Sequence, residues 1–238
     1  MELRLRLGML PQPDGTTCGP TSLHAVYRYF GDHVALEQVI DEVPRLDEGG
    51  TLAVHLACHA LARGYEASIF TYNLQVFDPT WFLPGAPDLP QRLEAQARGK
   101  GDEKLQVATR AYQQFLDGGG KLQFTDLTGA LVQRFVFAGM PILTGLSATY
   151  LYRCARERGP NCDYDDILGD PSGHFVVLCG YDRDDDTVLV ADPLLPNPVS
   201  ESNYYVVRSE RLICAILLGI LTYDANLLVV RPRGQAPA

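Results

Sequence analysis

The chain has 238 residues, a formal net charge of −9 and a hydrophobic content of 46%. This hydrophobic share allows a packed core and excludes wholesale disorder. The negative charge argues against nucleic acid as a partner, because phosphate contacts depend on clustered Lys and Arg.

The sequence shows no pattern typical of export or membrane insertion. Residues 1–7 alternate between apolar and polar, as in a strand and unlike a signal peptide. The longest apolar run, residues 212–221, is too short to cross about 30 Å of hydrocarbon as a helix. We therefore expect a soluble, cytoplasmic protein without a membrane partner, whose six cysteines are free thiols. Cys58, Cys179 and Cys214 have apolar neighbours and are expected to be buried.

Helices dominate the predicted elements of the N-terminal third. A strand at 3–9 leads into a loop, and a helix begins at Cys18 with Pro20 in its first turn. A short helix is expected at about 36–43. The next helix has Thr51 as its candidate cap, runs to about residue 63 and is followed by a strand at 65–72.

Residues 73–120 differ in composition from the rest of the chain. They are rich in Pro, Gly, Gln and charged residues, with helical pieces near 88–98 and 103–116. We interpret this segment as an insertion or lid within a single domain that spans residues 1–238. Segments of this kind are often functional, and a tolerated surface elaboration is the alternative.

Strands dominate the remainder of the chain. The predicted elements are a strand at 121–125, a helix at 127–138, strands at 140–146, 173–181, 187–192 and 203–208, a helix at 209–218 and a strand at 226–231. Helices followed by sequential strands predict an α+β fold, with N-terminal helices packed on an antiparallel β-sheet.

Two of these strands carry a histidine and an acid in a suggestive register. The segment between them, residues 181–186, has the composition of a turn. If the hairpin folds about Arg183, His174 and Asp192 lie directly opposite each other, with Cβ atoms about 4.5–5.5 Å apart. A slip of one residue would place the two side chains on opposite faces of the sheet.

Cys18 is the candidate nucleophile because it stands at a predicted helix start. Thiolate chemistry needs a sulfur that loses its proton readily, a base that shares this proton and a group that orients the base. A helix start and a neighbouring imidazolium both favour the thiolate. Gln12 lies six residues earlier, where its amide, beside the backbone N–H of Cys18, can donate to an oxyanion.

These motifs together resemble the papain-like cysteine peptidases. The resemblance rests on Gln12-x5-Cys18-Gly19-Pro20, Gly173-His174-Phe175-Val176-Val177 and Asp192-Pro193. It is strongest for the C39-like branch, relatives of the bacteriocin-processing peptidases, and covers about residues 10–30 and 170–195. The double-glycine preference of those enzymes does not transfer, because this chain carries no transporter segment and has an unfamiliar insertion.

The resemblance implies a papain-like fold and a role for each of four residues. Gln12 would be the oxyanion donor, Cys18 the nucleophile, His174 the general base and then acid, and Asp192 the group that orients His174. The substrate would be a peptide or protein, and no metal or organic cofactor would be needed. An acyltransferase with the same site and a non-catalytic binding protein of the same fold remain alternatives. The oligomeric state stays open.

Two other patterns receive a structural interpretation. His55 and His59 have metal-like spacing, but the central Glu of the zinc protease motif and a third ligand are missing. We expect them to be packed or surface histidines. The acidic run at 182–186 begins like a calcium loop but lacks the required Gly and closing Glu, so a charged hairpin tip is expected.

Overall fold

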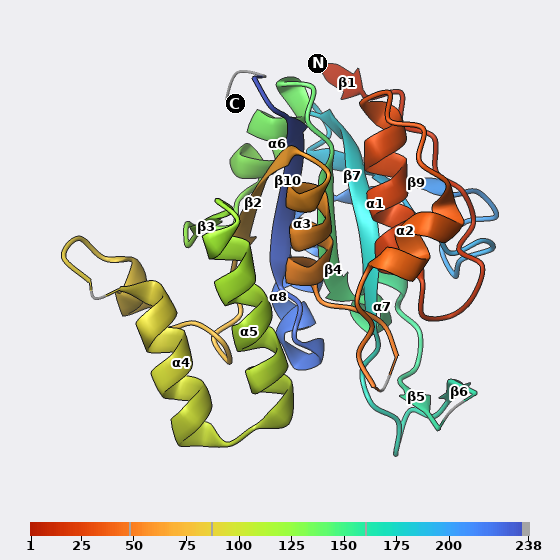
Figure 1. Cartoon of the computed structure of the whole chain (residues 1–238). Coiled ribbons are helices and arrows are strands. Elements are labelled where there is room, and N and C mark those ends of the chain that lie inside the picture. The colour runs from red at the N-terminus through yellow and green to blue at the C-terminus, as the bar shows by residue number, and fades with distance from the viewer. Residues whose placement is uncertain (48, 87, 160, 235–238) are drawn as a thin grey trace.

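The computed structural model describes residues 1–47, 49–86, 88–159 and 161–234. One eight-stranded sheet forms the centre of the molecule, with strand order β3-β2-β10-β4-β7-β8-β9 and β1 paired to β7 (Figure 1). Its strands are β1 (Glu2–Arg4), β2 (Tyr65–Thr71), β3 (Lys121–Gln123), β4 (Ile142–Ser147), β7 (Gly173–Asp182), β8 (Thr187–Ala191), β9 (Tyr204–Arg208) and β10 (Asn226–Pro232). The β2–β3 pair is parallel and the other pairs are antiparallel.

Helices cover both faces of this sheet. They are α1 (Cys18–Tyr29), α2 (Leu36–Glu42), α3 (Ala53–Ala62), α4 (Leu89–Lys100), α5 (Glu103–Asp117), α6 (Gly129–Phe137), α7 (Ala148–Tyr152) and α8 (Ser209–Leu218), with 3-10 turns η1 (Pro79–Phe82) and η2 (Gly219–Thr222). A second, two-stranded sheet pairs β5 (Glu157–Arg158) with β6 (Asp163–Tyr164). The predicted α+β class, with N-terminal helices on a mostly antiparallel sheet, is confirmed.

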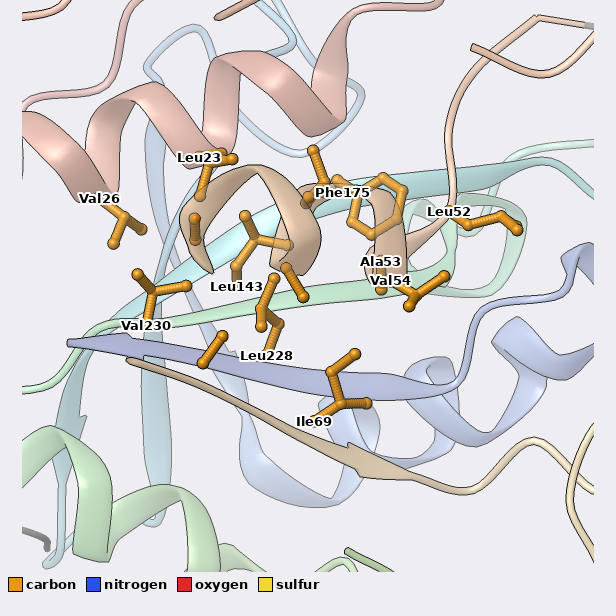
Figure 2. Close-up of a cluster of buried hydrophobic side chains, with 14 of the residues drawn as sticks. Leu23, Val26, Leu52, Ala53, Val54, Ile69, Leu143, Phe175, Leu228 and Val230 are labelled. Carbon is orange, nitrogen blue, oxygen red and sulfur yellow. The ribbon is translucent and has the colours of Figure 1, made fainter. Parts of the chain in front are cut away.

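Two apolar clusters hold the layers together, one on each face of the sheet. Alternation along the strands separates them, because neighbouring residues point to opposite faces. Phe175 and Val177 of β7 join the cluster under α1 and α3, whereas Val176 and Leu178 join the cluster under α6 and α8. Figure 2 shows side chains of α1, α3 and the strands meeting in the first cluster.

The segment from 73 to 120 contributes to this first cluster. Helix α5 has apolar residues at helical spacing, and Leu105, Tyr112 and Phe115 are buried in the same cluster as α1 and α3. Asp102 caps the helix, because its carboxylate accepts a hydrogen bond from the backbone N–H of Leu105. Helix α5 is therefore part of the packed core of the first face.

Several local expectations differ from the structure. The first strand is shorter than predicted, and α7, β5 and β6 lie in a stretch where no elements were expected. Thr51 does not cap α3, because its hydroxyl donates to the carbonyl of Pro44 and Leu52 holds the cap position. All six cysteines are free, as predicted, but of the three expected to be buried only Cys179 is, since Cys58 is half-buried and Cys214 is exposed. An apolar run does not reveal which side of its helix faces outward.

No helix in the described ranges is long and apolar enough to cross a bilayer.

Candidate active site

His174 and Asp192 meet through a register that differs from the predicted one. The turn occupies residues 183–186, and a register shift between Leu178 and Gly180 follows on β7. Val177 therefore faces Ala191, so that the next pair along the ladder is Val176 with Asp192. The predicted direct opposition of His174 and Asp192 is wrong, because the turn is centred between Asp184 and Asp185 and not on Arg183, and because β7 bulges.

The bulge restores the contact that the displaced turn would remove. The extra residue on β7 returns Asp192 to the face of the sheet on which His174 lies. Asp192 is then opposite Val176, which is two residues from His174. The imidazole Nε2 and the carboxylate Oδ1 are 2.8 Å apart. The two side chains are also among the most buried of the site, since 6% of His174 and 0% of Asp192 are exposed.

The carboxylate of Asp192 has hydrogen-bond partners on both oxygens. Oδ1 accepts from His174 and from the backbone N–H of Leu194 at 2.9 Å. Oδ2 accepts from the hydroxyls of Tyr152 and Tyr205, each at 2.7 Å. Burial raises the pKa of Asp192, but the charge of His174 and the hydrogen bonds outweigh this effect, so that the pKa is lowered overall.

His174 connects Asp192 to Cys18. Burial lowers the pKa of His174, whereas the charges of Asp192 and Cys18 and hydrogen bonds to both raise it, to about 10. Because Nε2 is engaged by Asp192, Nδ1 is the ring nitrogen that remains for the sulfur. The arrangement favours a charged imidazolium between two acidic groups.

Cys18 is the first residue of α1, and the local sequence brings this helix start against β7. A Cβ at Gly19 would lie 2.7 Å from Thr51 Cγ2 and 3.2 Å from Phe175 Cδ2, so only glycine permits this close approach. Ser22 donates to the carbonyl of Phe175 at 3.2 Å, which ties α1 to the residue after His174. Cys18 is 9% exposed.

Gln12 lies beside the end of β8. Its backbone N–H donates to the carbonyl of Pro193 at 2.8 Å, next to Asp192. Its side-chain Nε2 donates to the carbonyl of Asp14 at 2.7 Å. An amide nitrogen carries two hydrogens, so one remains for another acceptor. Among the described residues, Oε1 is buried without a partner.

The sequence analysis missed the two tyrosines that contact Asp192. The sequence could have indicated Tyr205, because Tyr205 and Val207 are the inward residues of the alternating strand β9. No sequence pattern indicated Tyr152, because it ends a short helix in a stretch where no element was expected.

A third missed residue is Asp224, a buried carboxyl that packs against Gly145 and Gly173. Burial raises its pKa to about 7, although a hydrogen bond from Thr222 and the charges of Lys104 and His174 act in the opposite direction. Because Gly173 directly precedes His174, this carboxyl lies close to the site. Its Oδ1 has no hydrogen-bond partner among the described residues.

The histidines with metal-like spacing are packed in the interior. His59 lies between the hydroxyl of Tyr27 and the carboxylate of Glu42, at 2.8 and 2.9 Å. His55 is buried beside Thr51. The described ranges contain no group of three or more His, Cys, Asp or Glu side chains that could hold a metal ion. The acidic run at 182–186 forms the hairpin tip.

Comparisons with known proteins agree with this architecture. The sequence model of the Peptidase_C39 like family matches residues 96–209, slightly less than half of the chain. The match includes His174 and Asp192 but begins after Gln12 and Cys18. No curated protein matches the chain.

Solved structures similar to this chain include three peptidases of low sequence identity. A putative C39-like peptidase from Bacillus anthracis has a TM-score of 0.53 at 15% identity, covering 97% of this chain and 98% of that one. A double glycine motif protease from an AMS/PCAT transporter, in complex with the leader peptide, has a TM-score of 0.45 at 15% identity, covering 96% of this chain and 94% of that one. Xylellain, a cysteine protease from Xylella fastidiosa, has a TM-score of 0.44 at 13% identity, covering 97% of this chain and 85% of that one.

The predicted resemblance to C39-like peptidases is thereby confirmed, and the fold is the papain-like α+β fold of this class. The family match over residues 96–209 supports the resemblance, and the Bacillus anthracis structure supports the fold.

Proposed function

We propose that the protein is a cysteine peptidase that cleaves a peptide bond through a thioester on Cys18. The observation that carries the proposal is the buried chain of contacts from Cys18 through His174 to Asp192. This chain supplies the three roles that thiol catalysis requires: a nucleophile, a base and an orienting acid. The peptidase family match adds independent support, because it includes two of the three residues.

In the proposed reaction, His174 Nδ1 takes the thiol proton and the Cys18 sulfur attacks the substrate carbonyl carbon. The backbone N–H of Cys18 and the remaining N–H of Gln12 Nε2 would donate to the oxyanion. The C–N bond then breaks, and the imidazolium gives its proton to the leaving amine. Water, deprotonated by His174, attacks the thioester, which releases the carboxylic acid and restores the thiol.

Several further assignments belong to the proposal. Residues 1–238 would form one peptidase domain with an insertion at about 73–120, since α5 shares the core of α1 and α3. The substrate would be a peptide or protein. The proposed steps use only side chains and backbone groups of this chain.

The reactivity of the six thiols gives a sharp test that needs no known substrate. Exposure alone would make Cys162 and Cys214 the first to react with iodoacetamide, because they are exposed and Cys18 is buried. Activation by His174 predicts the reverse: Cys18 is alkylated first, as mass spectrometry of the peptides would show. His174→Ala should abolish that preference. Labelling of Cys162 and Cys214 ahead of Cys18 in the wild type contradicts the proposal.

The reaction class is then tested with a quenched-fluorescence peptide library that presents every residue at each position. We expect cleavage without any acceptor amine, and none with Cys18→Ala. Product formation that requires an added amine or thiol would instead indicate an acyltransferase. A reactive Cys18 with no product under either condition would point to a binding protein that retains the site.

A further inference from the structure

Asp192 is held from two sides by residues that belong to neither the nucleophile nor the base. Tyr152 ends α7, and Tyr205 lies on β9, so the two hydroxyls reach Oδ2 from separate elements. Both tyrosines share a single acceptor oxygen at 2.7 Å, while the other oxygen serves His174 and Leu194. The carboxylate therefore has four donors and no freedom to rotate without breaking at least two hydrogen bonds.

We propose that Tyr152 and Tyr205 are positioning residues of the proposed peptidase site, which hold Asp192 as an ionised carboxylate aimed at His174. The inference rests on the proposed function and extends it to two residues outside the Cys18, His174 and Asp192 set. A buried carboxylate without donors takes up a proton instead of remaining charged. The two hydroxyls supply those donors on the side that His174 leaves open.

The arrangement also explains why the orienting group stays directed at one nitrogen. Hydrogen bonds to an ionised acceptor are about twice as strong as neutral ones. With Oδ2 fixed by two such bonds, Oδ1 is the oxygen that faces Nε2, and the hydrogen on Nε2 stays in place. Nδ1 is then the nitrogen that exchanges a proton with Cys18. Tyr152 also borders the imidazole directly, with its ring centroid 6.0 Å from that of His174.

The element that carries Tyr152 is itself fixed from outside. Helix α7 has five residues, and Arg153, which directly follows Tyr152, adopts the left-handed conformation at the C-cap. Arg211 of α8 donates to the carbonyl of Tyr150 at 2.8 Å and to that of Leu151 at 2.8 and 3.1 Å. Carbonyls at a helix end lack partners within the helix, so the guanidinium supplies them here. Tyr152 is thus delivered by a supported helix end and not by a free loop.

The test uses Tyr152→Phe, Tyr205→Phe and the double variant, because Phe fills the same space and removes only the hydroxyl. The rate of Cys18 alkylation by iodoacetamide is measured against pH, and kcat/KM is measured with a cleaved library peptide. Loss of a hydrogen bond to a charged group moves a pKa by about one unit. Because these bonds favour the charged form of Asp192, its pKa should rise when one is lost. We expect the acid limb of both profiles to move to higher pH by about one unit per hydroxyl, with KM little changed.

Tyr204→Phe is the matched control. The hydroxyl of this neighbour of Tyr205 makes two hydrogen bonds, donating to the carbonyl of Leu7 and accepting from the N–H of Met9, and neither involves Asp192. The variant should lose comparable thermal stability with an unchanged acid limb. If Tyr152 and Tyr205 had a purely structural role, their Phe variants would lose stability in the same way but keep the acid limb at the wild-type pH. That result would overturn the inference.

The peptidase function and the positioning role of the two tyrosines have distinguishable failures. If wild-type Cys18 shows no enhanced reactivity and no peptide is cleaved, the proposed function itself is wrong. If wild-type Cys18 is reactive and Tyr152→Phe and Tyr205→Phe keep its profile, only the positioning role is wrong. Circular dichroism of each variant establishes that the compared proteins are folded. Should the double variant fail to fold, the two single variants still decide the outcome.

Discussion

At the scale of single residues, the charge state of the site follows from two opposing effects on His174. Burial is the largest single effect and disfavours the imidazolium, whereas the charges of Asp192 and Cys18 and the hydrogen bonds to both favour it. Together the favourable effects outweigh burial, since the pKa of His174 rises to about 10. Because Asp192 is saturated with donors and completely buried, its charge acts at short range with little solvent screening.

Replacing this charge gives a prediction with a definite sign. Asp192→Asn keeps a hydrogen-bond acceptor for Nε2 and removes the negative charge, so burial should lower the pKa of His174. Hydrolysis needs the imidazolium to protonate the leaving amine. The alkaline limb of kcat/KM should therefore move down from about pH 10 by at least one unit. The measurement is a pH–rate profile with a cleaved library peptide, and an unchanged alkaline limb would count against the ion pair.

The same substitution has a stability signature. The raised pKa of His174 contributes stability that is complete below its unfolded pKa of about 6.5 and is lost as pH rises towards 10. The lowered pKa of Asp192 contributes stability above about 3.8 that is lost as pH falls. The destabilisation of Asp192→Asn should thus be largest between about pH 4 and 6.5. Asp186→Asn is the control, because Asp186 also accepts from a tyrosine and a serine, Tyr181 and Ser209, but does so at the hairpin tip.

At the scale of elements, the hairpin shows what the sequence can and cannot predict. The acidic run at 182–186 identified the turn but not its centre, and nothing marked the bulge near Cys179. The predicted register was off by two residues beyond the bulge. An even error keeps every side chain on its face, which is why His174 and Asp192 still meet. Tyr152 could not be predicted, because its position depends on α7 and on a distant arginine.

The hydrogen bonds from Arg211 predict how firmly the end of α7 is held. Arg211→Gln removes the forked donor from the carbonyls of Tyr150 and Leu151, so the end of α7 should fray and hold Tyr152 less firmly. We expect faster amide hydrogen exchange in residues 148–153. The acid limb of Cys18 alkylation should move in the same direction as in Tyr152→Phe, by a smaller amount.

Arg208→Gln is the matched control for this variant. Arg208 precedes α8, is exposed, and pairs only with Glu210 at 3.4 Å among the described salt bridges. It should change neither the exchange rates nor the profile. If Arg211→Gln accelerates exchange in α7 without moving the profile, Tyr152 does not depend on the helix end that Arg211 supports.

At the scale of the whole molecule, the segment from 73 to 120 shows what sequence patterns cannot predict about packing. The sequence predicted a helical piece near 103–116, and in the structure Leu105, Tyr112 and Phe115 recur on one buried face of α5. Periodicity identifies the apolar face of a helix but not the surface that covers it. In the fold that surface is the cluster shared with α1 and α3, whose composition depends on residues far apart in the chain. A lid and a core element are therefore indistinguishable from sequence, although they differ in energy.

Phe115→Ala separates these two descriptions by stability. Phe115 is fully buried in the cluster that also contains α3, so truncation leaves a cavity in the core and should cost about 3–5 kcal/mol of unfolding free energy in urea titrations. Leu83→Ala, in the same segment but 60% exposed, should change it by about 0.5 kcal/mol or less. A lid that opens independently would tolerate Phe115→Ala at under about 1 kcal/mol, and amides of α5 would exchange far faster than those of β7. A large cost with a single cooperative transition instead means that the site on β7 and the inserted helix unfold together, so changes in α5 would reach Cys18 through the shared core.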